Sequence, residues 1–147
     1  MNREPDLVVV GGNSQPYLKR WYIIPKNNYF NIYYHEFCAN DEDRALHDHP
    51  WYSLSFILTG GYYELTYGPD KTFQRKWYKP GSLVFRWPKY THRIELGKKD
   101  NELILAKTLF ITGPVLRNWG FYCPKGWVSW KEFGPRRGAG EPGKGCE

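Results

Sequence analysis

Long apolar runs are absent from this sequence of 147 residues. A membrane-spanning helix needs about 20 consecutive apolar residues, and no segment of the chain approaches that length. The apolar run near the N-terminus, at residues 7–10, is also too short for a secretory signal. We therefore expect a soluble, cytoplasmic protein with no membrane partner.

Cysteine is scarce, with only Cys38, Cys123 and Cys146 in the chain. These residues form no closely spaced pair of the kind that binds a metal, and an odd number cannot all pair within one chain. Reduced thiols are the usual state of cysteine in the cytosol. The cysteines therefore predict reduced thiols and no disulfide scaffold, in agreement with a cytoplasmic protein.

Alanine and methionine are also scarce, with a single methionine, whereas aromatic residues make up 18% of the chain. Aromatic side chains suit the half-buried, pleated surface of a sheet better than a helix. The length is sufficient for one domain with a hydrophobic core and too short for two domains of typical size. We predict a single all-β domain over residues 1–133 and a disordered tail over residues 134–147, which are Gly, Pro and charged residues with little to bury.

The formal net charge is +6, but Lys and Arg are scattered along the chain rather than gathered in a run. Nucleic-acid-binding proteins commonly concentrate basic residues on one face or in one segment. We therefore interpret the charge as a solvated basic surface and expect no nucleic-acid partner. An anionic small-molecule substrate is also compatible with this charge.

Short apolar or aromatic runs alternate with turn residues along most of the chain, which is typical of antiparallel strands in a sandwich or small barrel. The longest run, at residues 102–112, contains β-branched and aromatic residues that favour a central strand over a helix. Residues 118–133 are rich in Trp and Phe and are expected to form a hydrophobic strap over the core. The expected strands are residues 7–10, 17–24, 29–37, 45–59, 62–67, 72–78, 82–87, 93–96 and 102–112.

Three of the four histidines can be combined into one site. His47 and His49 are two residues apart, so in an extended strand both imidazoles project from the same face. His92 follows a turn that a closed barrel can bring beside them. Imidazole is a common ligand of transition metals, and three imidazoles leave open positions for water or substrate. The pattern favours a metal site formed by His47, His49 and His92.

The spacing around these histidines resembles the two sequence motifs of the cupin superfamily, G(x)5HxH(x)3-4E(x)6G and G(x)5PxG(x)2H. The residues that match are His47, His49 and Gly60 in the first motif, and Gly81, Pro88 and His92 in the second. The runs RWYIIP, LHDHPW, GGYYE and WGFYCPKGW also resemble a group of small cupin-like proteins of bacteria and their phages. The resemblance implies a double-stranded β-helix, or jelly-roll, barrel. It also implies a divalent metal on the three histidines, with Fe2+ expected first and Zn2+, Ni2+ or Mn2+ as alternatives.

The sequence departs from the first motif at Ser53, which stands where the motif has its glutamate ligand. Serine is a poor metal ligand beside a carboxylate. Either the site has three histidines, as in thiol-dioxygenase-like cupins, or Glu64 or His35 supplies a fourth ligand. His35 is by type more often a hydrogen-bonded structural histidine. Asp48 points to the opposite face from its two neighbours, which suits a turn or a supporting role.

Four polar residues near the motifs are candidate catalytic residues. A tyrosine can donate a hydrogen bond to substrate or oxygen, and an arginine can hold a carboxylate or phosphate through two hydrogen bonds. Simple packing of the tyrosines and solvation of the arginines are the alternatives. Arg44 and Arg86 are further candidates for binding an anion. The candidate catalytic residues are Tyr52, Glu64, Tyr90 and Arg93.

Together these features indicate a metal-dependent cupin enzyme of dioxygenase or isomerase/epimerase type, acting on a small polar or anionic molecule in the barrel. The alternative is a non-catalytic cupin that binds a sugar or nucleotide. A homodimer is expected because cupins commonly pair through outer sheet faces, and Leu54, Phe56 and Leu58 alternate with the residues that share the histidine face. These three residues would otherwise fill the core of a sandwich layer.

Overall fold

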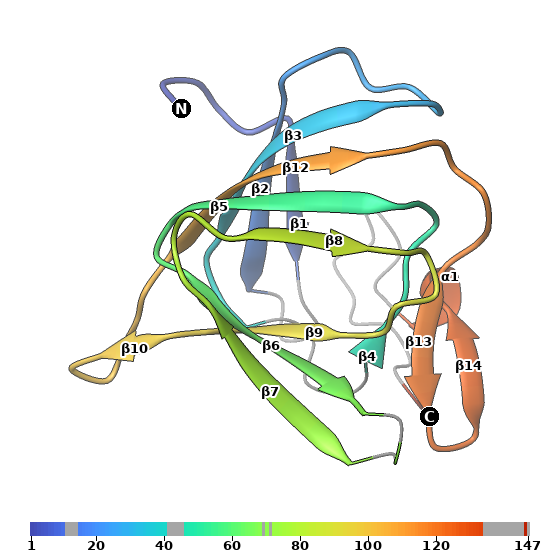
Figure 1. Cartoon of the computed structure of the whole chain (residues 1–147). Coiled ribbons are helices and arrows are strands. Elements are labelled where there is room, and N and C mark those ends of the chain that lie inside the picture. The colour runs from blue at the N-terminus through green and yellow to red at the C-terminus, as the bar shows by residue number, and fades with distance from the viewer. Residues whose placement is uncertain (11–14, 41–45, 69, 71, 134–145, 147) are drawn as a thin grey trace.

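The computed structural model describes residues 1–10, 15–40, 46–68, 70, 72–133 and 146, and its architecture is shown in Figure 1. Among these residues every strand pairing is antiparallel, and the only helix is the short α1 (Trp130–Phe133). No helix in these ranges is long and apolar enough to span a membrane. The all-β prediction is confirmed.

The largest sheet has six strands in the order β1-β2-β3-β12-β5-β8. Its strand β12 lies between β3 and β5, so the expected central position of this segment is confirmed. The strand begins four residues later than expected, because residues 102–103 pair with residues 98–99 instead. The bounds are β1 (Leu7–Val10), β2 (Pro16–Tyr22), β3 (Asn31–Phe37), β5 (Ser53–Thr59), β8 (Leu83–Arg86) and β12 (Ala106–Thr112).

In the described part of the chain, three smaller sheets accompany the large one (Figure 1). One has the order β7-β6-β9 and another has the order β14-β13-β4, while β10 and β11 form a hairpin. The bounds are β4 (Leu46–His47), β6 (Tyr62–Tyr67), β7 (Phe73–Tyr78), β9 (Arg93–Leu96), β10 (Lys98–Lys99), β11 (Glu102–Leu103), β13 (Gly120–Cys123) and β14 (Gly126–Ser129).

The core lies between the six-stranded sheet and the β7-β6-β9 sheet, since both contribute side chains to one buried cluster. Burial alternates strictly along β3 and β12, which turns every second residue inward. The interior also contains buried polar residues, among them Ser53, Thr108 and Thr112. The buried cluster is Leu18, Phe37, Ile57, Tyr62, Val84, Ile94, Leu96 and Ala106.

The segment expected as one strand over residues 45–59 is two strands in different sheets, so that prediction is wrong. Strand β4 pairs with β13, whereas β5 pairs with β12 and β8. The break spans residues 48–52 and contains Pro50, which lacks a backbone N–H and restricts the residue before it. The chain therefore passes from one sheet to another at the HxH motif.

The turn between β5 and β6 depends on two glycines. Gly60 and Gly61 have φ angles of 82° and 76°, a region that residues with a Cβ rarely adopt. A Cβ on Gly60 would also lie 2.1 Å from the backbone oxygen of Leu105. This tight turn directs the chain from the large sheet into β6.

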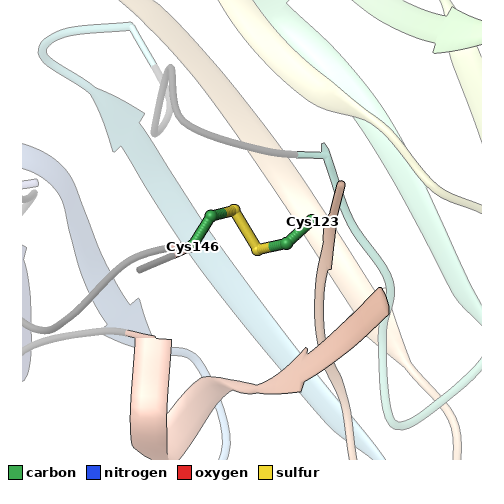
Figure 2. The surroundings of a disulfide bond; sticks show 2 residues. All are labelled: Cys123 and Cys146. Carbon is green, nitrogen blue, oxygen red and sulfur yellow. A yellow bond between two sulfur atoms is a disulfide. The ribbon is translucent and has the colours of Figure 1, made fainter. Parts of the chain in front are cut away.

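The expectation of reduced cysteines without a disulfide is wrong, because Cys123 and Cys146 are joined by a disulfide (Figure 2). Their separation of 23 residues gave no signal of pairing in the sequence. Cys38 is a free thiol. Disulfides persist mainly in oxidising compartments, so a cytoplasmic location stays a prediction that this bond does not support. The disordered tail expected over residues 134–147 lies outside the described residues except for Cys146.

Candidate metal centre

The structure brings His47, His49 and His92 together. Their candidate ligand atoms all lie within 4.8 Å of one another, and Nε2 of His92 is 3.2 Å from Nε2 of His49. The backbone fixes this approach, because the amide of His47 donates to the carbonyl oxygen of His92 and the amide of His92 donates back, both at 3.0 Å. Two ligands distant in sequence are thus direct cross-strand neighbours.

The geometry and protonation of this cluster fit a divalent metal. Imidazole nitrogens bind such metals at about 2.0–2.1 Å, which places neighbouring ligand nitrogens about 3.0–3.4 Å apart in octahedral or tetrahedral sites. The Nε2 atoms of His49 and His92 are 3.2 Å apart. Burial lowers the pKa of both rings well below the usual value, and positive charge from Arg86 and the neighbouring histidines lowers it further. Both imidazoles are therefore neutral near pH 7 and can donate lone pairs.

Glu64 lies behind His92. One carboxylate oxygen of Glu64 contacts Nδ1 of His92, on the opposite side of the ring from His49. An ionised carboxylate only accepts hydrogen bonds, so Nδ1 carries the proton and Nε2 faces the histidine cluster. This arrangement of carboxylate, histidine and metal position is common in metalloproteins and orients the ligand ring. The structure thus places Glu64 where it supports His92 from behind the ring.

Arg86 completes this buried group. Its guanidinium donates to Glu64 at 2.5 Å, to the Ser55 hydroxyl at 2.9 Å and to the Tyr62 hydroxyl at 3.0 Å, and the side chain is only 2% exposed. Burial acts to lower the pKa of Arg86, but Tyr62 and Glu64 raise it by more, so the guanidinium stays charged. The Arg86 guanidinium is thus held by three protein groups. Arg44 lies outside the described residues.

Asp48, between the two motif histidines, anchors the C-terminal hairpin formed by β13 and β14. Its fully buried carboxylate accepts from the amide of Gly120 at 2.8 Å and from Nε1 of Trp127 at 3.2 Å. It also forms an ion pair with Arg117 at 2.9 Å, and Arg117 donates to the backbone oxygen of His49 at 3.2 Å. The supporting role expected of Asp48 is therefore the docking of this hairpin.

The same hairpin brings aromatic rings to the exposed side of the cluster. The ring of His47 lies 6.1 Å from that of Trp119 and 5.8 Å from that of Phe121, measured between centroids. On the other side, the indole of Trp51 stacks on His49 at 5.3 Å. The strap expected over residues 118–133 thus packs beside the histidines as well as over its own small cluster around Phe121 and Phe133.

Tyr90, a further candidate residue, lies beside the histidines. Its ring centroid is 5.8 Å from that of His92, and burial, aided by the charge of Glu64, raises the pKa of Tyr90 to about 12. Tyr52 is 46% exposed and stacks on the exposed ring of Phe85 at 5.9 Å.

Arg93 and His35 contact other groups. The Arg93 guanidinium carbon lies 5.8 Å from the ring centroid of Phe73. The buried imidazole of His35 accepts a hydrogen bond from Nε of Arg20 at 2.8 Å, and burial lowers its pKa well below the usual value. His35 is not part of the metal cluster, so its contacts are those of a structural histidine.

Two supporting interactions were not anticipated from the sequence: the pairing of Arg86 with Glu64 and the docking of the hairpin on Asp48. For the first interaction, the only sequence signal is the alternation along β8, where Leu83 and Phe85 would be expected to face the core and Arg86 the solvent. The structure shows the reverse, because Leu83 and Phe85 are exposed and Arg86 is buried. The second involves residues about 70 positions apart, which no local pattern relates.

No family model and no curated protein matches the sequence. Solved structures do match. The cupin 2 conserved barrel domain protein from Rhodopseudomonas palustris has a TM-score of 0.55 and 15% identity, over 76% of this chain and 70% of that chain. The DMSP lyase DddQ from Ruegeria pomeroyi DSS-3 has a TM-score of 0.57 and 17% identity, over 81% and 58%. The FeII form of HppE with substrate has a TM-score of 0.58 and 15% identity, over 76% and 57%. The chain therefore has the cupin fold, and it spans under two thirds of the latter two proteins.

Proposed function

We propose that this chain, with its cupin fold, is a metal-dependent enzyme of dioxygenase or isomerase/epimerase type that acts on a small polar or anionic molecule. The observation that carries the proposal is the convergence of His47, His49 and His92, with Glu64 behind His92. Fe2+ is the first candidate metal, since neutral imidazoles suit it, and Zn2+, Ni2+ and Mn2+ are alternatives. The FeII structure of HppE, which has a similar fold, is consistent with iron.

Each residue near the cluster has a part in this proposal. When bound, the metal supplies a Lewis acid and, if it is redox-active, a centre for oxygen chemistry. Glu64 keeps Nε2 of His92 turned toward the site. Tyr90, with its raised pKa, stays protonated and can donate a hydrogen bond to a substrate oxygen. Trp51 and Trp119 limit the access of water from two sides.

A non-catalytic cupin that binds a sugar or nucleotide is the second candidate. It is favoured by the position of Tyr52, which is 46% exposed and stacks on the exposed ring of Phe85. With Tyr90 beside the cluster, acid–base chemistry would depend on that side chain and on bound water. Such a protein would bind its ligand after the histidines are replaced, whereas the enzyme would not.

We also propose that the chain forms a homodimer through the outer face of β5 and β8. Leu83 and Phe85 are 65% and 62% exposed, although they alternate with the buried Val84 and Arg86. They are cross-strand partners of Phe56 and Leu54, and Leu54 and Phe56 in turn pair with apolar residues of β12. An apolar sheet face of this kind is normally covered, and sheets pack face to face about 10 Å apart. A second copy, packed about a two-fold axis, presents the same apolar face.

Metal analysis tests the leading proposal. Protein purified without chelator is expected to contain about one divalent metal per chain, or to take one up on addition of Fe2+, Zn2+, Ni2+ or Mn2+. His47→Ala and His92→Ala should each lose that metal, whereas His35→Ala, which lies outside the cluster, should retain it. Sub-stoichiometric metal with no uptake in the folded protein would overturn the proposal.

A further inference from the structure

A row of buried polar residues crosses the inner face of the large sheet. Across β3, β12, β5 and β8, the cross-strand partners are Asn31 with Thr112, Thr112 with Ser53, and Ser53 with Arg86. Their relative exposures are 3%, 0%, 3% and 2% in the order Asn31, Thr112, Ser53 and Arg86. Burial of a polar side chain costs free energy unless the side chain is hydrogen-bonded, so each of these four residues needs a hydrogen-bond partner.

The two outer members of the row have protein partners, and the two inner ones do not. Asn31 exchanges hydrogen bonds with the backbone of Asn27, and Arg86 is held by Glu64 and its neighbours. Among the described residues, the hydroxyls of Ser53 and Thr112 have no hydrogen-bond partner. A buried hydroxyl without a partner is unfavourable and rare, so these two adjacent hydroxyls need a partner other than the described protein groups.

The two hydroxyls can reach the same ligand group. Directly opposed residues of antiparallel strands have Cβ atoms about 4.5–5.5 Å apart. Ser53 and Thr112 are opposed in this way. One carboxylate, with two oxygens that each accept hydrogen bonds, spans such a pair.

The pair lies on the wall that adjoins the metal centre. Trp51 stacks on His49 at 5.3 Å and packs edge-on against Phe110 at 5.4 Å. Phe110 and Thr112 are both buried and share the inner face of β12. On its other side, Ser53 is opposed to Arg86, which is linked through Glu64 to His92.

Charge determines which ligand this place favours. Within the residues that the structure describes, the cluster contains three histidines and no carboxylate, and the carboxylate of Glu64 is paired with the guanidinium of Arg86. Ser53 contributes no charge at the position where the cupin motif has a glutamate. A divalent metal on these histidines would therefore lack a carboxylate ligand, and an anion beside it would be stabilised by Coulomb attraction in a buried site.

We propose that Ser53 and Thr112 form a subsite for the carboxylate of a small-molecule substrate beside the metal centre. Each hydroxyl donates one hydrogen bond to the carboxylate, which also offsets the charge of the metal. This inference rests on the proposed metal-dependent function and narrows its substrate class to small carboxylates.

The test uses the Co2+-loaded full-length chain, because the visible absorption of Co2+ reports its coordination without any assay of activity. Acetate is titrated, with acetamide as a neutral molecule of the same shape and inorganic phosphate as a larger anion. Acetate is expected to change the spectrum saturably, and acetamide is not. A response to phosphate that equals or exceeds the acetate response would overturn the assignment to carboxylates.

Variants separate the subsite from the metal. Ser53→Ala and Thr112→Val should each raise the acetate dissociation constant by about tenfold or more, because each removes a hydrogen bond to a charged group. Thr112→Ser keeps a hydroxyl and should retain most of the affinity. Thr59 lies on β5 with Ser53, but its side chain is exposed. Thr59→Val, which removes that exposed hydroxyl, should therefore bind acetate like the original protein.

The outcomes of this test distinguish the two proposals. Uptake of Co2+ without an acetate response, or variants that are folded by circular dichroism and bind acetate unchanged, would overturn the carboxylate subsite and leave the metal centre standing. If the folded protein takes up no Co2+ at all, the proposed function fails and the subsite fails with it.

Discussion

Nδ1 of His92 lies against the carboxylate of Glu64 in the interior of the protein, while Nε2 of the same ring faces His49. Because the carboxylate fixes which nitrogen carries the proton, we expect Glu64→Gln to lower metal affinity by about 10- to 100-fold. The substitution should also destabilise the protein by about 3–5 kcal/mol, since it leaves the buried charge of Arg86 unpaired. Metal titration and urea unfolding measure the two effects.

A double variant separates these two effects of Glu64. Glu64→Gln combined with Arg86→Met removes both buried charges, so most of the lost stability should return. Metal affinity should stay low, because His92 still lacks its carboxylate. A Glu64→Gln protein that binds metal as tightly as the original would contradict the orienting role.

Asp48 should control the docking of the β13–β14 hairpin. In Asp48→Asn an amide replaces an acceptor that bonds Gly120, Trp127 and Arg117, so one N–H is brought against another donor. We expect a loss of about 2–4 kcal/mol in unfolding free energy. Amide hydrogen exchange should become faster at residues 120–123 and stay slow in β12. Equal protection of β13 in both proteins would show that the hairpin is held by other contacts.

Reduction of the Cys123–Cys146 disulfide should destabilise the chain. The bond joins two cysteines that are 23 residues apart in the sequence. For a loop of this size, the chain-entropy model gives a stabilisation of about 3 kcal/mol. Urea unfolding with and without dithiothreitol, and of Cys146→Ser, measures this loss. Thiol labelling of the oxidised protein should modify Cys38 alone. Labelling of three cysteines before reduction would contradict the pairing.

Acid should destabilise the metal-free protein through its buried histidines. Burial lowers the pKa of His35, His49 and His92 in the folded state, whereas the unfolded chain titrates near the usual value of about 6.5. Above that pH both states are neutral, and the full stability is present. As the pH falls below about 6.5 the unfolded state binds more protons, so stability drops by up to about 1.4 kcal/mol per pH unit for each histidine.

Urea unfolding in the presence of chelator, from about pH 8 down to about pH 5, tests this dependence. His35→Phe removes one buried histidine that lies outside the metal cluster, and its stability should depend less steeply on pH. Stability that is constant over this range would contradict the burial of neutral imidazoles.

The apolar outer face predicts a dimer that a single charge breaks. Phe85→Glu places a carboxylate in the centre of the proposed interface and should convert the dimer to monomer. Phe73→Glu, at a comparably exposed ring on the other sheet, is the matched control and should leave the dimer intact. Sedimentation velocity measures the outcome. A monomeric starting protein, or a dimer that survives Phe85→Glu, would contradict this interface.

Much of the fold could be predicted because strand signals are local. The strands expected over residues 29–37 and 62–67 each depend on a pattern of a few residues, and the structure confirms both. The break at Pro50 was missed because the apolar run continues past the proline, while the chain changes sheets there. The sequence does not give the outward position of Phe85, since a hydrophobic pattern cannot distinguish a core face from an apolar outer face.

The candidate site was only partly predictable. The HxH spacing indicates the histidine pair directly, and the second motif indicates His92. By contrast, the contacts of Glu64 with Arg86 and of Asp48 with Gly120 join residues 22 and 72 positions apart. Such contacts depend on how the sheets meet, which no short pattern encodes.

The backbone pairing of His47 with His92 has a consequence for how the empty and loaded forms differ. His47 belongs to the sheet of the C-terminal hairpin, His92 directly precedes β9 of another sheet, and His49 leads into β5 of the third. A metal ion bound by all three imidazoles would cross-link these three sheets. Loading should therefore slow the opening of the whole barrel, and heat resistance should rise with the concentration of free metal as mass action requires.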